Sequence, residues 1–89
     1  MRIDKFLKVS RIIKRRTLAK EVAEQGRIKV NDVVAKPSIS VAPGDEIEIT
    51  FGHTIVTVRV RNVKEHVKKD EAEMLYELVK EERRIENEK

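Results

Sequence analysis

The chain has 89 residues and a mass of 10.4 kDa, which is enough for one small domain and excludes a two-domain enzyme. Charged residues make up 40 % of it and hydrophobic residues 39 %. There is no cysteine, which excludes disulfide bonds and cysteine zinc sites. No run of apolar residues reaches membrane-spanning length and the N-terminus has no apolar signal segment, so we expect a soluble, cytoplasmic protein that does not enter a membrane.

Positive charge is concentrated at the N-terminus. Residues 1–44 hold 11 Lys or Arg and 4 Asp or Glu, a net +7, whereas residues 45–89 hold 9 and 12, a net −3. The first twenty residues contain one anion, Asp4, and eight cations. These cations are Arg2, Lys5, Lys8, Arg11, Lys14, Arg15, Arg16 and Lys20. A surface built only for solubility mixes both signs, so this imbalance favours a polyanionic partner, either nucleic acid or an anionic membrane surface.

Apolar spacing predicts two short helices in the N-terminal half, over residues 3–9 and 17–25, with a polar bend at 10–16 between them. The second helix should end at Gly26, a typical left-handed C-terminal cap. Its expected apolar face consists of Leu18, Ala19, Val22 and Ala23.

After Gly26 the apolar period changes to two, which predicts a small curled antiparallel sheet over residues 28–63. Asn31-Asp32 should turn a short hairpin, and Pro43-Gly44 should form a second turn. Two longer strands follow, at 46–51 and around 56–60. The residues expected to face the core are Ile47, Ile49, Phe51, Val56, Val58 and Val60, whereas Thr57 should face outward.

Residues 68–89 are expected to form an acidic C-terminal helix that packs on the domain and frays at its end. Asp70 and Glu73 have the spacing of a capping box. The apolar stripe of this helix would be Ala72, Leu75, Tyr76 and Val79. The predicted fold class is therefore α+β, with two short N-terminal helices on a small curled antiparallel sheet, plus a C-terminal helix.

The residues that could carry catalysis or bind a metal are not arranged to do so. The glycines are far apart, so no phosphate-binding glycine loop is present. His53 and His66 lack metal-ligand spacing, and Ser10 and Thr17 have no paired base nearby in sequence. We expect no catalytic residue, no cofactor and no metal.

Four segments follow one another in the order and spacing of the S-four-type RNA-binding domain family. They are MRIDKFLKVSR at 1–11, KRRTLA at 14–19, GRIKVN at 26–31 and PGD at 43–45. The resemblance covers residues 1 to about 52, the αL motif core, and we expect the RNA-binding domain to span residues 1–67. The whole chain resembles the stand-alone members of this family that act in bacterial ribosome-associated quality control, which are related to a small ribosome-binding heat-shock protein.

The resemblance implies that the two helices and the following hairpin lay a basic face on structured RNA. It implies a non-catalytic factor that binds the stalled large ribosomal subunit carrying peptidyl-tRNA and contacts both ribosomal RNA and tRNA. Such a factor stabilises the P-site tRNA while an RqcH-type partner directs untemplated alanine tailing of the nascent chain for degradation. We expect a ribosome-associated monomer.

The resemblance also implies which residues contact RNA. Its phosphate ligands match Arg2, Lys5, Arg11, Lys14, Arg15 and Arg16, and Lys8 and Lys20 belong to the same basic run. Asp4 is also included among the expected site residues. Its favoured role is to stabilise the helix dipole, ahead of orienting Arg16 or accepting a hydrogen bond from an RNA hydroxyl.

The sequence departs from the family pattern at one helix cap. Many members have Ser or Thr at the position of Arg15, so the cap of the second helix is lost here. Phe6, the only aromatic residue of the basic half, has core spacing, which disfavours binding by stacking on unpaired bases.

Three alternatives differ in what they predict. A heat-shock-type factor that recycles large subunits would have the same fold but no alanine-tailing partner. An interaction module for anionic lipid would need the Trp- and Phe-rich apolar face that the basic segment lacks. An RNA-modifying enzyme that carries this domain would need a catalytic domain for which 89 residues leave no room.

Overall fold

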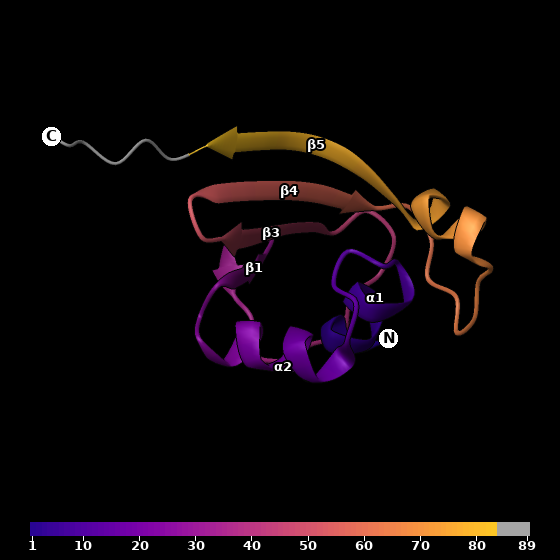
Figure 1. Cartoon of the computed structure of the whole chain (residues 1–89), viewed down its shortest axis with the longest axis horizontal. Coiled ribbons are helices and arrows are strands. Elements are labelled where there is room, and N and C mark those ends of the chain that lie inside the picture. Colours follow the sequence, from indigo (N-terminus) through magenta and orange to yellow (C-terminus); the bar gives the residue numbers. More distant parts are fainter. Residues whose placement is uncertain (84–89) are drawn as a thin grey trace, which may run out of the picture.

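Two short helices precede a five-stranded antiparallel sheet in the computed structural model, which describes residues 1–83 (Figure 1). The elements in chain order are α1 (Ile3–Val9), α2 (Arg16–Glu24), β1 (Ile28–Val30), β2 (Val33–Val34), β3 (Glu46–Phe51), β4 (Thr54–Val60), the 3₁₀ helix η1 (Lys69–Leu75) and β5 (Tyr76–Arg83). The strand order is β2-β1-β3-β4-β5. In Figure 1 the two helices lie beside β1 and β3, and β5 lies on the far side of β4. No helix within residues 1–83 is both long and apolar enough to cross a membrane.

The two predicted N-terminal helices are confirmed to within one residue at each end. In α1 the side chains of Ile3, Phe6 and Leu7 are fully buried, as their i, i+3, i+4 spacing predicts. In α2, however, Leu18 is 47 % exposed, so its predicted place on the apolar face is wrong. The buried face is centred on the i, i+3, i+4 set that begins at Ala19, and Leu18 lies about 100° away from Ala19 around the helix.

The turns form where the sequence predicts them. Gly26 has a φ of 76°, which is the left-handed cap that ends α2. Asn31 and Asp32 have φ values of 51° and 68°, the two positive values that a type I′ hairpin turn requires. At the second turn the backbone N–H of Asp45 donates to the carbonyl of Ala42 at 3.1 Å.

The inward face of β3 and β4 is largely as predicted, because Ile47, Ile49, Val58 and Val60 are at most 1 % exposed. Phe51 is an exception with 36 % exposure, since it ends β3 at the turn into β4.

Thr57 was expected to face outward, yet it is only 9 % exposed. It lies in the middle of β4 between Glu48 of β3 and Lys80 of β5. A strand with neighbours on both sides loses solvent contact on its outer face too, and the sequence did not predict the second neighbour.

The expected C-terminal helix is wrong over residues 69–83, where the chain forms η1 and then β5. β5 pairs antiparallel with β4, placing Tyr76 opposite Val60 and Leu78 opposite Val58. The free edge of β4 offers a full row of backbone hydrogen bonds, and this tertiary pairing overrides the local helix preference of the segment. The expected fraying concerns Glu81 onward; Glu81–Arg83 belong to β5, and residues 84–89 lie outside the described residues.

The capping box expected from Asp70 and Glu73 is also displaced. The carboxylate of Glu71 accepts the backbone N–H of Lys68 at 3.3 Å, and the N–H of Glu71 donates to the carbonyl of Lys68 at 2.9 Å. Only the carboxylate half of a capping box therefore forms, because the side chain of Lys68 has no acceptor, and it lies two residues earlier, at the start of a 3₁₀ helix.

Candidate nucleic-acid interface

A buried carboxylate holds two arginines of the basic run side by side. The side chain of Asp4 is 3 % exposed, and those of Arg2 and Arg16 are 48 % and 47 % exposed. Arg2 donates to both Asp4 oxygens, from Nε at 3.2 Å and from Nη2 at 3.1 Å, and Arg16 donates from Nη2 to Oδ1 at 3.4 Å. The backbone N–H of Lys5 donates to the same Oδ1 at 2.7 Å. We call Arg2, Asp4 and Arg16 the Asp4 cluster.

This geometry bears on the three roles considered for Asp4. Its contact with the Lys5 N–H in the first turn of α1 suits the helix dipole, and its contacts with both arginines orient them. Because the Asp4 carboxylate lies beneath the two guanidinium groups and is almost fully buried, it has little surface left for an RNA hydroxyl.

Two parts of the backbone hold the arginines in place. The N-terminus is tied to a loop across the molecule, because the N–H of Ile3 donates to the Ile39 carbonyl at 2.7 Å and the N–H of Val41 donates to the Met1 carbonyl at 2.8 Å. Arg16 is the first residue of α2, after Arg15 in an extended conformation with no side-chain capping hydrogen bond. The loss of the cap at Arg15 is thus as predicted.

The other predicted site residues fall into separate groups. Five of them are exposed and have no ion-pair partner within residues 1–83: Lys8, Arg11, Lys14, Arg15 and Lys20. Lys14 and Arg15 line a hollow beside the exposed Leu18, whereas Lys8 and Arg11 lie at the C-terminal end of α1.

Lys5 differs from these five cations. Its ammonium group pairs with Glu65, whose pKa is lowered below the ordinary value, first by the hydrogen bond from Lys5 and then by the charge of that lysine. The charge of Lys5 is therefore partly neutralised within the protein, unlike that of the other five cations.

A groove of about 510 Å³ extends the Asp4 cluster and adds a cation that sequence reasoning missed. Its lining includes three cations, Arg2, Lys20 and Lys36, and one carboxylate, that of Glu24, and it brings α2 and the segment 34–38 together. Lys36 is exposed and has no carboxylate partner within the described residues. Lys36 is the single cation of residues 34–38, and this is the only signal in the sequence that points to it. Its place beside the N-terminus depends on a tertiary contact, which the sequence does not reveal.

Three cations on the sheet, Lys29, Arg59 and Lys80, are instead paired with carboxylates. Arg59 lies 2.8 Å from Glu46 and 3.5 Å from Glu77, and Lys29 lies 4.0 Å from Glu48. The hydrogen bond to Glu46, with its charge, raises the pKa of Arg59. The five unmatched cations of the N-terminal run, by contrast, lie on α1, on α2 and on the bend between them, and such a group of unpaired positive charges favours a polyanionic partner.

No group of three or more His, Asp or Glu side chains within residues 1–83 is placed to hold a metal ion. The chemistry that the basic face supports is the binding of phosphates, for which arginine offers paired donors.

Known proteins resemble this chain along most of its length. Residues 1–47 match the S4 domain family. The RQC P-site tRNA stabilizing factor of Halalkalibacterium halodurans is 66% identical over 92% of this chain and 93% of its own length. The factor of the same name from Bacillus subtilis is 59% identical over 93% of this chain and 96% of its own.

Among solved structures, Heat Shock Protein 15 of Vibrio cholerae, described as trimeric, superposes with a TM-score of 0.82 at 34% identity, over 89% of this chain and 81% of that one. The chain thus belongs to the S4 domain proteins and, within them, to the RqcP family of RQC P-site tRNA stabilizing factors.

Proposed function

We propose that this protein is a non-catalytic RNA-binding factor of bacterial ribosome-associated quality control. It binds the large ribosomal subunit that carries peptidyl-tRNA, contacts ribosomal RNA and tRNA, and stabilises the tRNA in the P site. An RqcH-type partner meanwhile directs alanine tailing of the nascent chain. The observation that carries this proposal is the Asp4 cluster, in which two half-exposed guanidinium groups are fixed by one buried carboxylate.

The physical chemistry of the cluster suits folded RNA. Structured RNA is recognised by its shape and phosphates, so its ligands must be held at fixed spacing on a rigid surface. Asp4 provides that rigidity, because it reduces the number of rotamers open to Arg2 and Arg16 before RNA arrives. The groove lined by Lys20 and Lys36 continues the positive surface beside them.

The proposal is tested by cosedimentation of the protein with large ribosomal subunits over a salt series. Arg2→Ala and Arg16→Ala should weaken binding and each lower the slope of log affinity against log salt by about 1, because one phosphate contact is lost. Arg59→Ala is the matched control, since it removes an arginine that carboxylates already neutralise. Equal cosedimentation of all four proteins at every salt concentration would rule out the Asp4 cluster as the RNA contact.

The fold similarity to Heat Shock Protein 15 supports a second candidate, a large-subunit recycling factor of the heat-shock type. The two functions differ in their partners. Tagged protein purified from its own cells should bring an alanine-tailing factor with it under the first proposal, and free large subunits without such a factor under the second.

The proposed acting form is a monomer, because a single chain supplies every residue of the Asp4 cluster and the groove. Light scattering at the concentration used for cosedimentation measures this directly, and a trimer there would contradict it.

A further inference from the structure

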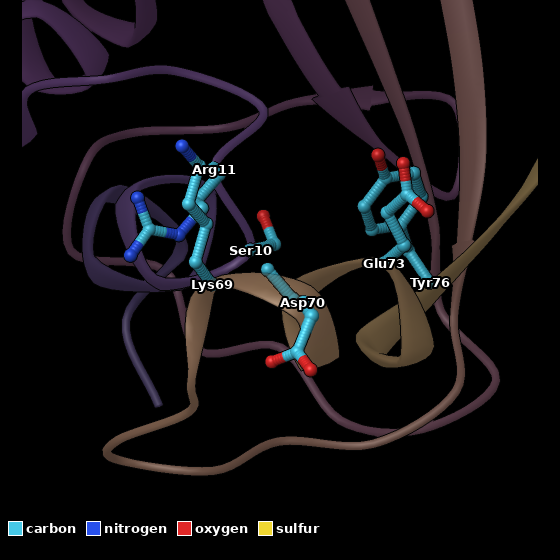
Figure 2. Close-up of a pocket in the computed structure, with 7 residues that line it drawn as sticks. Ser10, Arg11, Lys69, Asp70, Glu73 and Tyr76 are labelled. Carbon is cyan, nitrogen blue, oxygen red and sulfur yellow. The ribbon is translucent and has the colours of Figure 1, made fainter.

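A second pocket lies between the C-terminal end of α1 and the C-terminal segment, apart from the Asp4 cluster. It has a volume of about 620 Å³, within the range of sites that hold small organic ligands. Arg11 and Lys69 lie on one side of it in Figure 2 and Glu73 and Tyr76 on the other, with Ser10 between them. Asp70 also lines the pocket, and in Figure 2 its carboxylate points away from Arg11 and Ser10. We call it the α1–η1 pocket.

The cationic side of this pocket is arranged for a phosphate. Within the described residues neither Arg11 nor Lys69 has a carboxylate partner, although both line the same cavity. Arg11 also has a φ of 64°, a left-handed conformation that residues other than glycine rarely adopt. This left-handed residue ends α1 directly after its C-cap Ser10, and the turn places the Arg11 side chain at the pocket.

The opposite side offers an aromatic ring and a carboxylate. Tyr76 is half-buried and packs against the hydrophobic core, which fixes its ring. Its hydroxyl has no hydrogen-bond partner within residues 1–83, and the same holds for the exposed carboxylate of Glu73. A fixed aromatic ring can stack on a nucleobase, and a carboxylate can accept hydrogen bonds from the edge of a base.

We propose that the α1–η1 pocket binds one unpaired nucleotide extruded from folded RNA. Its phosphate contacts Arg11 and Lys69, its base stacks on Tyr76, and Glu73 accepts hydrogen bonds from the base edge. A carboxylate acceptor favours guanine, whose edge presents a ring N–H and an amino group next to each other. This inference rests on the proposed function, because the Asp4 cluster is what brings the RNA to this end of the molecule.

Tyr76 allows a direct test, since the chain has one tyrosine and no tryptophan and its ultraviolet emission reports on this pocket alone. Two RNA hairpins are compared that differ by a single bulged guanine. The bulged hairpin should quench Tyr76 emission and bind about 10-fold more tightly than the fully paired one, as expected for stacking of one base. A third hairpin with a bulged uridine, which has one ring N–H and no amino group, should gain less.

Variants of exposed residues then test the pocket without endangering the fold. Lys69→Ala should remove most of the advantage of the bulged hairpin, and Glu73→Gln should remove the preference for guanine over uridine. Lys64→Ala is the matched control, because it deletes the same charge from an exposed position outside the pocket lining. It should leave the ratio of the two affinities unchanged.

The outcomes separate this proposal from the proposed function. Equal binding of the paired and bulged hairpins, with equal Tyr76 emission, overturns the pocket proposal and leaves binding at the Asp4 cluster intact. Failure of Arg16→Ala to weaken either hairpin contradicts the proposed function instead. Quenching by free guanosine monophosphate without any difference between the hairpins overturns RNA as the source of the nucleotide.

Discussion

The helical region and the sheet region differ in how their arginines are paired with carboxylates. On the sheet, Arg59 is matched with two carboxylates on neighbouring strands, so its charge is satisfied within the protein. In the helical region one buried carboxylate, that of Asp4, serves both Arg2 and Arg16, so the pair keeps a net positive charge and a fixed orientation. The difference shows how a chain with a net charge of only +4 presents a strongly basic face.

The largest effect is expected from Asp4→Asn, which removes the negative charge that holds Arg2 and Arg16 together. The free energy of unfolding should fall by about 2 kcal/mol, because hydrogen bonds to a charged group are lost in a buried place. Affinity for large subunits should fall about 10-fold, equal to about 1.4 kcal/mol, since the two arginines lose their orientation. Chemical denaturation and cosedimentation measure the two effects.

Asp32→Asn is the control for this change, because it makes the same substitution at an exposed turn position that tolerates Asn. Binding of unstructured RNA offers a further check, since Asp4→Asn makes the protein more positive and should not weaken it. If the variant binds large subunits as tightly as the parent chain does, Asp4 does not act through the arginines.

The N-terminal half could be predicted from sequence because its signals are local. Helix spacing at Ile3, Phe6 and Leu7 and the turn at Asn31-Asp32 depend on neighbours in the chain, and both are confirmed. The basic run could be recognised from the count of charged residues, but not the contacts that its members form.

The C-terminal strand and the pairing of Asp4 with two arginines depend on distant contacts, and sequence reasoning missed or understated them. β5 forms because β4 offers a free edge, which no local pattern in residues 76–83 reveals. For the same reason the sequence suggested no stacking residue for the basic half, although the fold brings Tyr76 into one pocket with Arg11.

Arg11→Gly should separate stability from binding within the helical region. Glycine adopts a φ of 64° without strain, so the free energy of unfolding should rise by up to about 1 kcal/mol, reduced by the greater freedom of glycine in the unfolded chain. Binding to large subunits should weaken several-fold because one cation is lost. Lys8→Ala, which removes a cation from regular helix, should weaken binding without raising stability. A loss of stability in Arg11→Gly would show that the arginine side chain itself supports the fold.

A smaller effect on binding is expected from Lys36, which we compare with Lys29. Lys36→Ala should weaken binding to large subunits about 3-fold and lower the salt slope, since this lysine lines the groove with Arg2 and forms no ion pair within residues 1–83. Lys29→Ala should change binding little, because Lys29 lies near Glu48 on the sheet. Equal losses in the two variants would show that RNA contacts the sheet as well as the helices.

The smallest effect concerns the ion pair between Lys5 and Glu65, which joins α1 to the segment after β4. The pKa of Glu65 in the folded protein is lowered below its ordinary value of 4.5, chiefly by the hydrogen bond from Lys5. A group with a lowered folded pKa contributes stability that is present above the unfolded pKa and is lost as the pH falls through the folded pKa.

Glu65→Gln should therefore lower the melting temperature slightly and by a constant amount from neutral pH down to about pH 5, and the difference from the parent chain should vanish at lower pH. Because both side chains reach solvent, the difference should also shrink in high salt. Glu24→Gln, an exposed position on α2 with no ion pair within residues 1–83, should show no such pattern. A difference that instead grew as the pH fell would mean that the neutral carboxyl of Glu65, and not its ionised form, stabilises this junction.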